Sequence, residues 1–487
     1  MSEKETNAIK IMEEKFKPRP RESLFITKNV VIIGLAFMVH FTAYGGAANL
    51  QSSINAEDGL GTASLAAVYA GLIVSNMFLP AIMIRWLGPK WTLCASFVMY
   101  MPWIGTQLWP HFYTMIPAAI LLGVGGAPLW CSKKIYILIV SKAWSKMTNI
   151  PVDVLFTRLL GLFTMLFLFN SIWGNLLSSL VISSGDNEAA YTSVNASLIP
   201  EVCGANFILG EDAGKVLKPQ PKEKIQMLTG IFLACMAGAA LIVAVGVDSV
   251  KRYEPLLEKL ESGTGSLFGM TLQVMVEPNQ LMMITVNVFL GFAQAFSGAD
   301  FTAAYVSCVI GTGSIGFVMM GSGVADAVGC LVTGYLSKIT GRVPLISLAF
   351  IVQGALYAFM LSWRPQADHQ AVVYGIAMIW GACDSIWIIQ IASFTSGLFP
   401  GREEAAYCNF SLWESMGFII AYITSPYLRI SSKIYIQIVL MVVGVAFYFV
   451  VEYRQKQKQK REAEISENEK EVGKYTAYTN TAFSVIE

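Results

Sequence analysis

Charged side chains are scarce in this chain of 487 residues, and their scarcity limits what kind of protein it can be. Asp, Glu, Lys and Arg make up 14% of the residues, against about 25% in an ordinary globular protein. The signs nearly cancel, with a net charge of +1, so we expect no nucleic-acid partner. There are 3 His, and no Cys or His spacing is typical of a metal site. We therefore expect no metal, no cofactor and no enzyme active site.

Long apolar runs occupy most of the chain in place of the missing charges. Residues 29–50 contain no Asp, Glu, Lys or Arg, and similar runs recur about twelve times. A helix needs about 20 apolar residues to cross roughly 30 Å of hydrocarbon, and a spanning segment must satisfy its own backbone hydrogen bonds. The sequence therefore predicts an all-α, multi-pass membrane protein. The predicted spans are 29–50, 62–84, 90–109, 112–132, 153–182, 227–248, 281–301, 313–337, 343–362, 371–398, 405–428 and 434–453.

The positions of Lys and Arg predict an orientation and a division into two halves. If the N-terminus is cytoplasmic, most of the 34 Lys and Arg fall on the cytoplasmic side, so the positive-inside rule favours two cytoplasmic termini. Two six-helix pseudo-repeats with both termini inside are the layout of major facilitator transporters. The predicted parts are a cytoplasmic tail 1–28, a first half 29–248, a cytoplasmic linker 249–280, a second half 281–453 and a disordered tail 454–487.

Two short basic turns support a weak internal repeat. The first contains Arg85, Gly88 and Lys90 after the second span. The second follows the eighth span and contains Lys338, Gly341 and Arg342, and Gly334 at the end of that span belongs to the same loop motif. Because any short cytoplasmic loop needs glycine and cations, an unrelated origin of the two turns remains the alternative.

The loop 183–226 is the largest segment predicted on the opposite, lumenal side. It contains the sequon Asn195-Ala196-Ser197, so Asn195 is a candidate glycosylation site. Cys203 lies in the same loop, and Cys308 lies near the lumenal end of the seventh or eighth span. A disulfide between these two cysteines is one possibility.

Three carboxylates fall inside predicted spans of the second half: Asp326, Asp384 and Glu414. Ionisable groups within a bilayer are costly, so they are candidates for a proton or cation relay. The alternative is that they are structural acids held by hydrogen bonds to neighbouring helices. His40 in the first span is either a proton-sensitive switch or a hydrogen-bonded packing residue.

Several motifs, in the same order along both halves, resemble the uncoordinated-93 family. They are Phe41-Thr42-Ala43-Tyr44, Asn49-Leu50-Gln51-Ser52-Ser53-Ile54-Asn55, Gly126-Ala127-Pro128-Leu129-Trp130, Trp173-Gly174-Asn175, Gly323-Val324-Ala325-Asp326-Ala327 and Trp380-Gly381-Ala382-Cys383-Asp384. The resemblance covers roughly residues 28–451 and implies a twelve-helix major facilitator fold. It also implies two possible roles, because the founding nematode member resembles a potassium-channel regulatory subunit and a vertebrate branch escorts Toll-like receptors from the endoplasmic reticulum.

One departure from the general major facilitator pattern bears on mechanism. The loop motif Gly-x-Leu-x-Asp-Arg-x-Gly-Arg has Lys338 at its acidic position here, and Arg85 takes the matching place in the first half. A base reverses the sign of the charge at the cytoplasmic gate, which counts against an ordinary transporter. The first hypothesis is therefore a regulatory subunit of a potassium channel in the plasma membrane, with a channel or other membrane protein and the lipid bilayer as partners. A proton- or cation-coupled solute transporter and a trafficking escort are the alternatives.

Overall fold

The structure, a computed structural model, describes residues 21–76, 79–184, 199–216, 220–256, 264–366, 368–399 and 402–483. Within these ranges every element is a helix, and no strand occurs. Ten helical stretches there are long and apolar enough to cross a membrane. The prediction of an all-α, multi-pass membrane protein is confirmed.

All twelve predicted spans fall on helices. The long helices of the first half are α2 (Glu22–Ala48), α4 (Leu60–Asn76), α5 (Leu79–Gly105), α6 (Phe112–Thr148), α7 (Val152–Ser183) and α10 (Lys222–Gly246). In the second half, α12 (Pro278–Ala295) continues through the π-helix η5 (Phe296–Ser307) into α13 (Cys308–Ile310). It is followed by α14 (Ile315–Thr340), α15 (Arg342–Ser362), α16 (Gln370–Leu398), α17 (Glu403–Thr424) and α18 (Ile430–Phe483).

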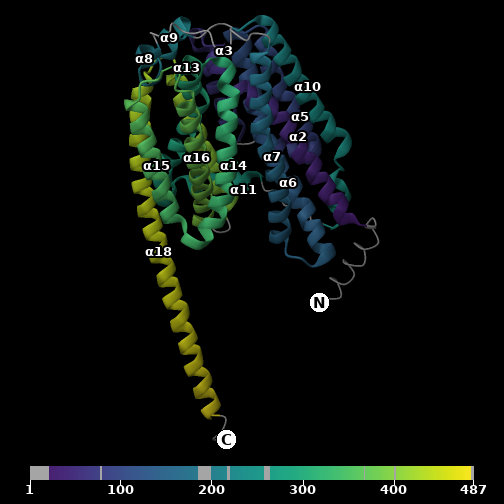
Figure 1. The fold of residues 1–487 in the computed structure, drawn as a ribbon. Coiled ribbons are helices and arrows are strands. Elements are labelled where there is room, and N and C mark those ends of the chain that lie inside the picture. The colour runs from purple at the N-terminus through teal and green to yellow at the C-terminus, as the bar shows by residue number, and fades with distance from the viewer. Residues whose placement is uncertain are drawn as a thin grey trace.

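The packing of the helices repeats between the halves. In the first half α2 packs on α7 and α10, α4 packs on α6, and α5 packs on both α6 and α10. In the second half α12 packs on α17 and α18, α14 packs on α16, and α15 packs on both α16 and α18. Counted by spans along the chain, the second set of pairs is the first set shifted by six. This repetition supports the two six-helix pseudo-repeats (Figure 1).

Glycines occupy equivalent crossings in the two halves. A Cβ on Gly174 of α7 would lie 2.5 Å from the carbonyl oxygen of Thr42 on α2. A Cβ on Gly417 of α17 would lie 2.2 Å from the carbonyl oxygen of Val288 on α12. Helix pairs in a membrane associate largely through close backbone packing, which small residues permit. In each half, a glycine on the fifth span thus allows that span to pack closely against the first span.

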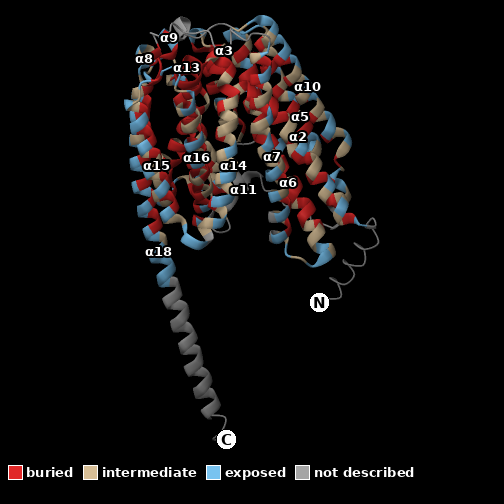
Figure 2. Ribbon diagram, in the orientation of Figure 1, coloured by how far each residue is buried: buried red, intermediate tan, exposed pale blue. Residues whose placement is uncertain are grey.

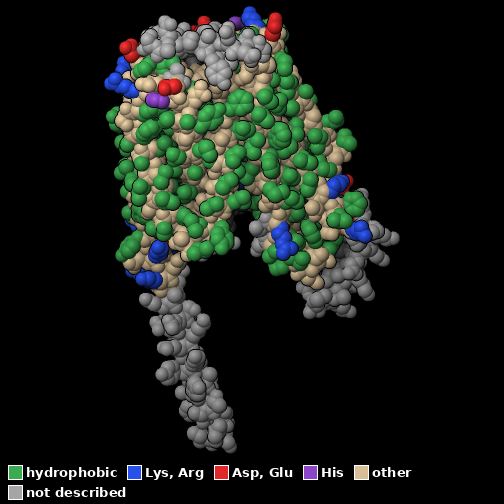
Figure 3. Space-filling model, viewed as in Figure 1, with side chains coloured by type: hydrophobic (Ala, Val, Ile, Leu, Met, Phe, Trp, Pro, Cys, Tyr) green, Lys and Arg blue, Asp and Glu red, His purple; other side chains and the backbone are tan. Residues whose placement is uncertain are grey.

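The surface and interior follow the expectation for a membrane protein. Buried residues fill the centre of each half, whereas exposed residues lie on the outside of the bundle (Figure 2). Many of these exposed side chains are apolar, and Leu331 on α14 is 76% exposed. In the space-filling view they form a broad hydrophobic band, and charged side chains gather near its two ends (Figure 3). Such a band matches the hydrocarbon layer of a bilayer.

Two predicted irregular segments contain helix. The predicted linker 249–280 includes η4 (Val250–Leu256) and α11 (Thr264–Met275). The tail predicted as disordered from residue 454 continues α18 as far as Phe483, and this extension projects from the bundle (Figure 1). Its sequence is rich in Gln, Lys, Glu and Arg, which are good helix formers, and it contains no proline. Helix propensity therefore prevails over the high charge on which the prediction of disorder rested.

Candidate functional site

The candidate site is the interface between the two halves. Across this interface α4 packs on α17 and α7 packs on α14. The end of the bundle from which α18 projects is called the tail end here. The opposite end is called the strap end, after the segment 199–216 that crosses it. Figure 3 shows the surface hollowed between the halves at the tail end and closed toward the strap end. The interface is therefore accessible from one side.

Polar contacts close the strap end. Ser52 and Ser53 lie on the short helix α3 (Gln51–Ile54), which follows α2 in the first half. The hydroxyl of Ser52 lies 3.3 Å from that of Thr302, and the hydroxyl of Ser53 lies 2.8 Å from that of Ser307, both on η5 of the second half. All four side chains are buried. Hydrogen bonds in such surroundings are protected from competing water, so they hold the halves together at this end.

A segment of the first half also crosses onto the second half at this end. It comprises residues 199–216, with the short helices α8 (Ile199–Val202), η3 (Gly204–Asn206) and α9 (Leu209–Val216), and is called the strap here. A disulfide joins Cys203 of the strap to Cys308. The backbone N–H of Gly210 donates to the carbonyl of Pro426 at 3.2 Å, and that of Ile430 donates to the carbonyl of Phe207 at 3.1 Å. The strap therefore links the halves both covalently and by hydrogen bonds.

The three carboxylates predicted from the sequence come together in the second half. The carboxyl group of Asp384 on α16 lies within electrostatic range of Asp326 on α14 and Glu414 on α17. The thiol of Cys330 lies 3.6 Å from Asp326 Oδ1, and the amide of Gln294 donates to Glu414 Oε1 at 3.3 Å. All three carboxylates are partly exposed rather than fully buried. Their role as a proton or cation relay stays a prediction.

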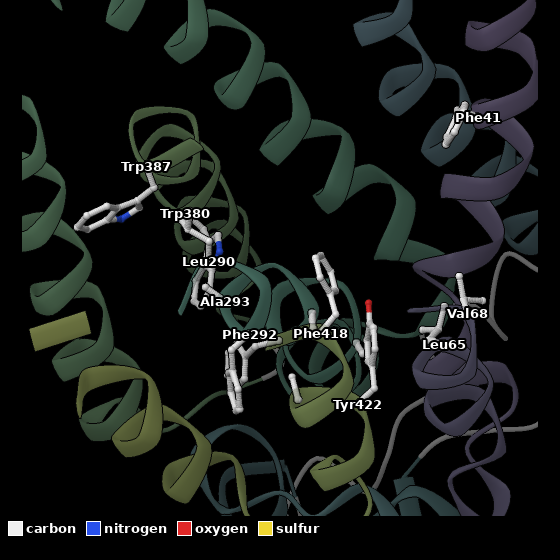
Figure 4. Close-up of a cluster of buried hydrophobic side chains, with 14 of the residues drawn as sticks. Phe41, Leu65, Val68, Leu290, Phe292, Ala293, Trp380, Trp387, Phe418 and Tyr422 are labelled. Atoms are coloured by element: carbon white, nitrogen blue, oxygen red, sulfur yellow. The ribbon is translucent and has the colours of Figure 1, made fainter. Parts of the chain in front are cut away.

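Aromatic side chains connect Glu414 to the first half. The ring of Tyr69 on α4 stacks on Phe418 of α17, with centroids 4.0 Å apart and planes 6° apart. Tyr69 also interacts electrostatically with Glu414 and shares a hydrogen bond with Tyr44 of α2. Figure 4 shows Phe418 and Tyr422 on the α17 side of this contact, with Leu65 on the facing helix. Glu414 therefore lies beside an aromatic layer to which both halves contribute.

Two lysines of α6 complete the charge distribution near the interface. Lys134 Nζ lies 3.6 Å from the ring centroid of Tyr407 on α17, which is a cation–π contact between the halves. Lys133 is buried and lies over the rings of Trp130 and Phe163 within the first half. The first half thus brings lysine side chains to the interface, and the second half brings carboxyl groups near it.

His40 lies apart from the three acids. Its ring stacks on Phe97 at 4.3 Å and meets Tyr100 edge-on at 4.8 Å, both on α5 of the first half. The side chain is fully buried, and neither ring nitrogen has a hydrogen-bond partner among the described residues. A neutral ring fits these apolar surroundings better than a charged one. The geometry favours packing over a proton-sensitive role.

The sequence analysis missed a buried ion pair at the strap end. Asp300 of η5 pairs with Lys433 of α18, and the hydroxyl of Ser425 donates to the same carboxylate at 2.5 Å. The side chains of Lys433 and Asp300 are 0% and 2% exposed. The sequence did contain a signal for this pair. Asp300 is an acid near the end of the predicted seventh span, and Lys433 is a base just before the predicted twelfth span.

The two predicted basic turns lie at the tail end. Gly88 and Gly341 both have positive φ values, 75° and 78°, which glycine adopts readily. Arg342 Nη2 lies 3.8 Å from Glu452 Oε2 on α18. Arg85 is exposed, Lys90 lies over the ring of Trp91, and Gly334 has open space around it. The side chain of Lys338 and the whole of Asn195 lie outside the described residues.

Comparison with known proteins gives the fold and the family. NupG, a nucleoside transporter of known crystal structure, superimposes with a TM-score of 0.58 at 13% identity, covering 87% of this chain and 98% of that chain. Protein unc-93 homolog A of Xenopus laevis is 35% identical over 88% of this chain and 93% of its own length. The putative potassium channel regulatory protein unc-93 of Caenorhabditis elegans is 28% identical over 88% of this chain and 61% of its own length. The model of the family described as ion channel regulatory protein UNC-93 matches residues 51–450. The chain therefore belongs to the UNC-93 family.

Proposed function

We propose that this protein is a regulatory subunit of a potassium channel, located in the plasma membrane with both termini in the cytoplasm. The name of the Caenorhabditis elegans relative supports the kind of partner. The distribution of Lys and Arg supports the orientation. The structural observation that carries the proposal is the disulfide between the strap and the second half.

The disulfide bears on function because of how transporters of this fold operate. Alternating access requires the two halves to rock against each other around a central site. In this chain the strap, which belongs to the first half, is bonded through Cys203 to Cys308 of the second half. The buried hydroxyl contacts of Ser52 and Ser53 lie at the same end. These bonds resist opening at the strap end and favour one fixed shape, as a binding subunit requires.

The test is whole-cell recording of two-pore potassium channels with and without this chain. We expect a change in current or gating only on co-expression. The double variant Asp384→Asn/Glu414→Gln should modulate the channel as the unchanged chain does, because a fixed binding surface does not use these acids. If neither current nor surface level of any candidate channel changes, the proposal is wrong.

The cluster of Asp326, Asp384 and Glu414 favours a second candidate, a proton- or cation-coupled solute transporter. These carboxylates lie beside an interface that is hollowed at the tail end. Such a protein would carry a proton- or sodium-dependent current when expressed alone. The variant Asp384→Asn/Glu414→Gln should then abolish the current, and an unchanged current would exclude the relay. The same variant therefore separates the two candidate functions.

A further inference from the structure

A dense group of cations follows the apolar part of α18. Residues 454–461 contain five Lys or Arg, three Gln and no Asp or Glu; they are called the basic segment here. The five cationic residues are Arg454, Lys456, Lys458, Lys460 and Arg461, and all are exposed. The segment is helical throughout. The backbone of the segment is therefore helical, and its charged side chains are exposed on that helix.

Neighbouring contacts fix the level of the basic segment relative to the turns of the bundle. Glu452 is buried beside Arg342, which begins α15 at the turn after α14. Residue 452 is thus level with the turns that close the bundle at the tail end. Tyr453 follows with 65% of its surface exposed, as is common for aromatic residues at a membrane interface. The basic segment begins at the next residue and extends about 10 Å along the helix, which is enough to cross one headgroup layer of about 5–8 Å.

The cations lie on more than one side of the helix. Arg454, Lys458 and Arg461 have the i, i+4, i+7 spacing of one face, whereas Lys456 and Lys460 share another. Glu452 precedes them and contacts Lys456 Nζ at 3.6 Å, and Glu462 and Glu464 follow them directly in sequence. Arg454 contacts the sulfur of Met282 at 3.7 Å. This arrangement matches a surrounding layer of negative charge better than a single acidic groove on a partner.

We propose that the basic segment binds the anionic headgroups of the membrane leaflet at the tail end. Lys and Arg clusters directly beside a membrane-spanning helix attract phosphatidylserine and phosphoinositide headgroups, and the attraction weakens with salt. The exposed position of the five cations at headgroup level supplies the complementary charge. The site lies outside the interface between the halves and does not depend on whether the protein regulates a channel.

The test uses the full-length chain titrated with phosphatidylinositol 4,5-bisphosphate, with bound lipid counted by native mass spectrometry. The test variant carries Arg454→Gln, Lys456→Gln, Lys458→Gln, Lys460→Gln and Arg461→Gln. We expect its apparent affinity for this lipid to fall at least tenfold. A control variant neutralises other cations of the tail end, with the substitutions Arg85→Gln, Lys90→Gln and Lys146→Gln, and should change less than twofold.

A second variant separates charge from altered folding. Lys456→Arg/Lys458→Arg/Lys460→Arg keeps every charge and should bind as the unchanged chain does, with an affinity that falls as salt rises. Phosphatidylcholine, which carries no net charge, should bind all variants equally. Unchanged phosphoinositide affinity in the Gln variant would overturn the proposal, and so would loss of binding in the Arg variant. If the segment binds only a protein and not lipid, the Gln variant should show unchanged phosphoinositide affinity.

Discussion

The two ends of this bundle are held together in different ways. At the strap end, the disulfide Cys203–Cys308 and the hydroxyl pairs of Ser52 and Ser53 join one half to the other. At the tail end, the described ion pairs that join two elements each lie within one half. They are Lys28–Asp248 and Glu22–Arg252 in the first half, and Arg342–Glu452 and Arg402–Glu277 in the second. Covalent and hydrogen-bonded contacts between halves thus concentrate at the strap end, whereas the contact between halves described toward the tail end is the cation–π contact of Lys134 with Tyr407.

This difference explains why the molecule is open at the tail end (Figure 3). Ion pairs within a half fix its own helices but do not resist separation of the halves. Among the described residues, the buried hydrogen bonds and the disulfide between halves resist separation at the strap end. The strap end should therefore contribute more to the stability of the whole bundle, and its substitutions should have larger effects than those at the tail end.

The largest effect is expected for the buried ion pair beneath the strap. Lys433→Ala leaves Asp300 as a buried carboxylate without its cation, and breaking a buried pair in this way costs about 3–5 kcal/mol. The midpoint of thermal unfolding, measured by size-exclusion chromatography in detergent, should fall sharply. The double variant Asp300→Asn/Lys433→Met removes both charges and should be more stable than Lys433→Ala. A double variant as unstable as the single one would show that packing, not charge, is the cause.

Loss of the disulfide should have the next largest effect. The bond closes a loop with a sequence separation of 105 residues, and native disulfides typically contribute about 2–4 kcal/mol. Cys203→Ser/Cys308→Ser should therefore unfold at a lower temperature than the unchanged chain under oxidising conditions. A reducing agent should lower the midpoint of the unchanged chain but not that of the variant. Equal sensitivity of both proteins to reduction would contradict a stabilising role for this bond.

A single methyl group should disturb the interface between the halves at the strap end. A Cβ on Gly316 of α14 would lie 1.9 Å from the carbonyl oxygen of Asn175 on α7, so Gly316→Ala must push the halves apart. Overpacking of this kind costs about 1–3 kcal/mol. Gly334→Ala is the matched control, because it lies on the same helix with no atom within 4 Å of its Cβ position. Alanine is the better helix former there, so the control should be neutral or stabilising.

The sequence predicted the helices well because each apolar run contains its own signal. Even α17, which is not among the ten apolar stretches of the structure, was predicted despite the polar Asn409 and Glu414 within it. Contacts between distant helices have no such signal. Asp300 and Lys433 are 133 residues apart, and only the fold reveals that they meet. Likewise, Asp326, Asp384 and Glu414 can each be identified from the sequence as an acid within an apolar span. That they lie close together depends on how α14, α16 and α17 pack.

The smallest effect is expected for an exposed ion pair at the tail end. Lys28 Nζ lies 3.4 Å from Asp248 Oδ2, and their side chains are 43% and 33% exposed. Water and salt screen such pairs, so Lys28→Gln should cost at most about 1 kcal/mol and its effect should vanish at high salt. A loss of stability in Lys28→Gln as large as that in Gly316→Ala would mean that the tail end also holds the whole bundle together. Because Asp248 additionally accepts a hydrogen bond from Asn29 on α2, the first half should remain intact in Lys28→Gln, and the contrast between the two ends should persist.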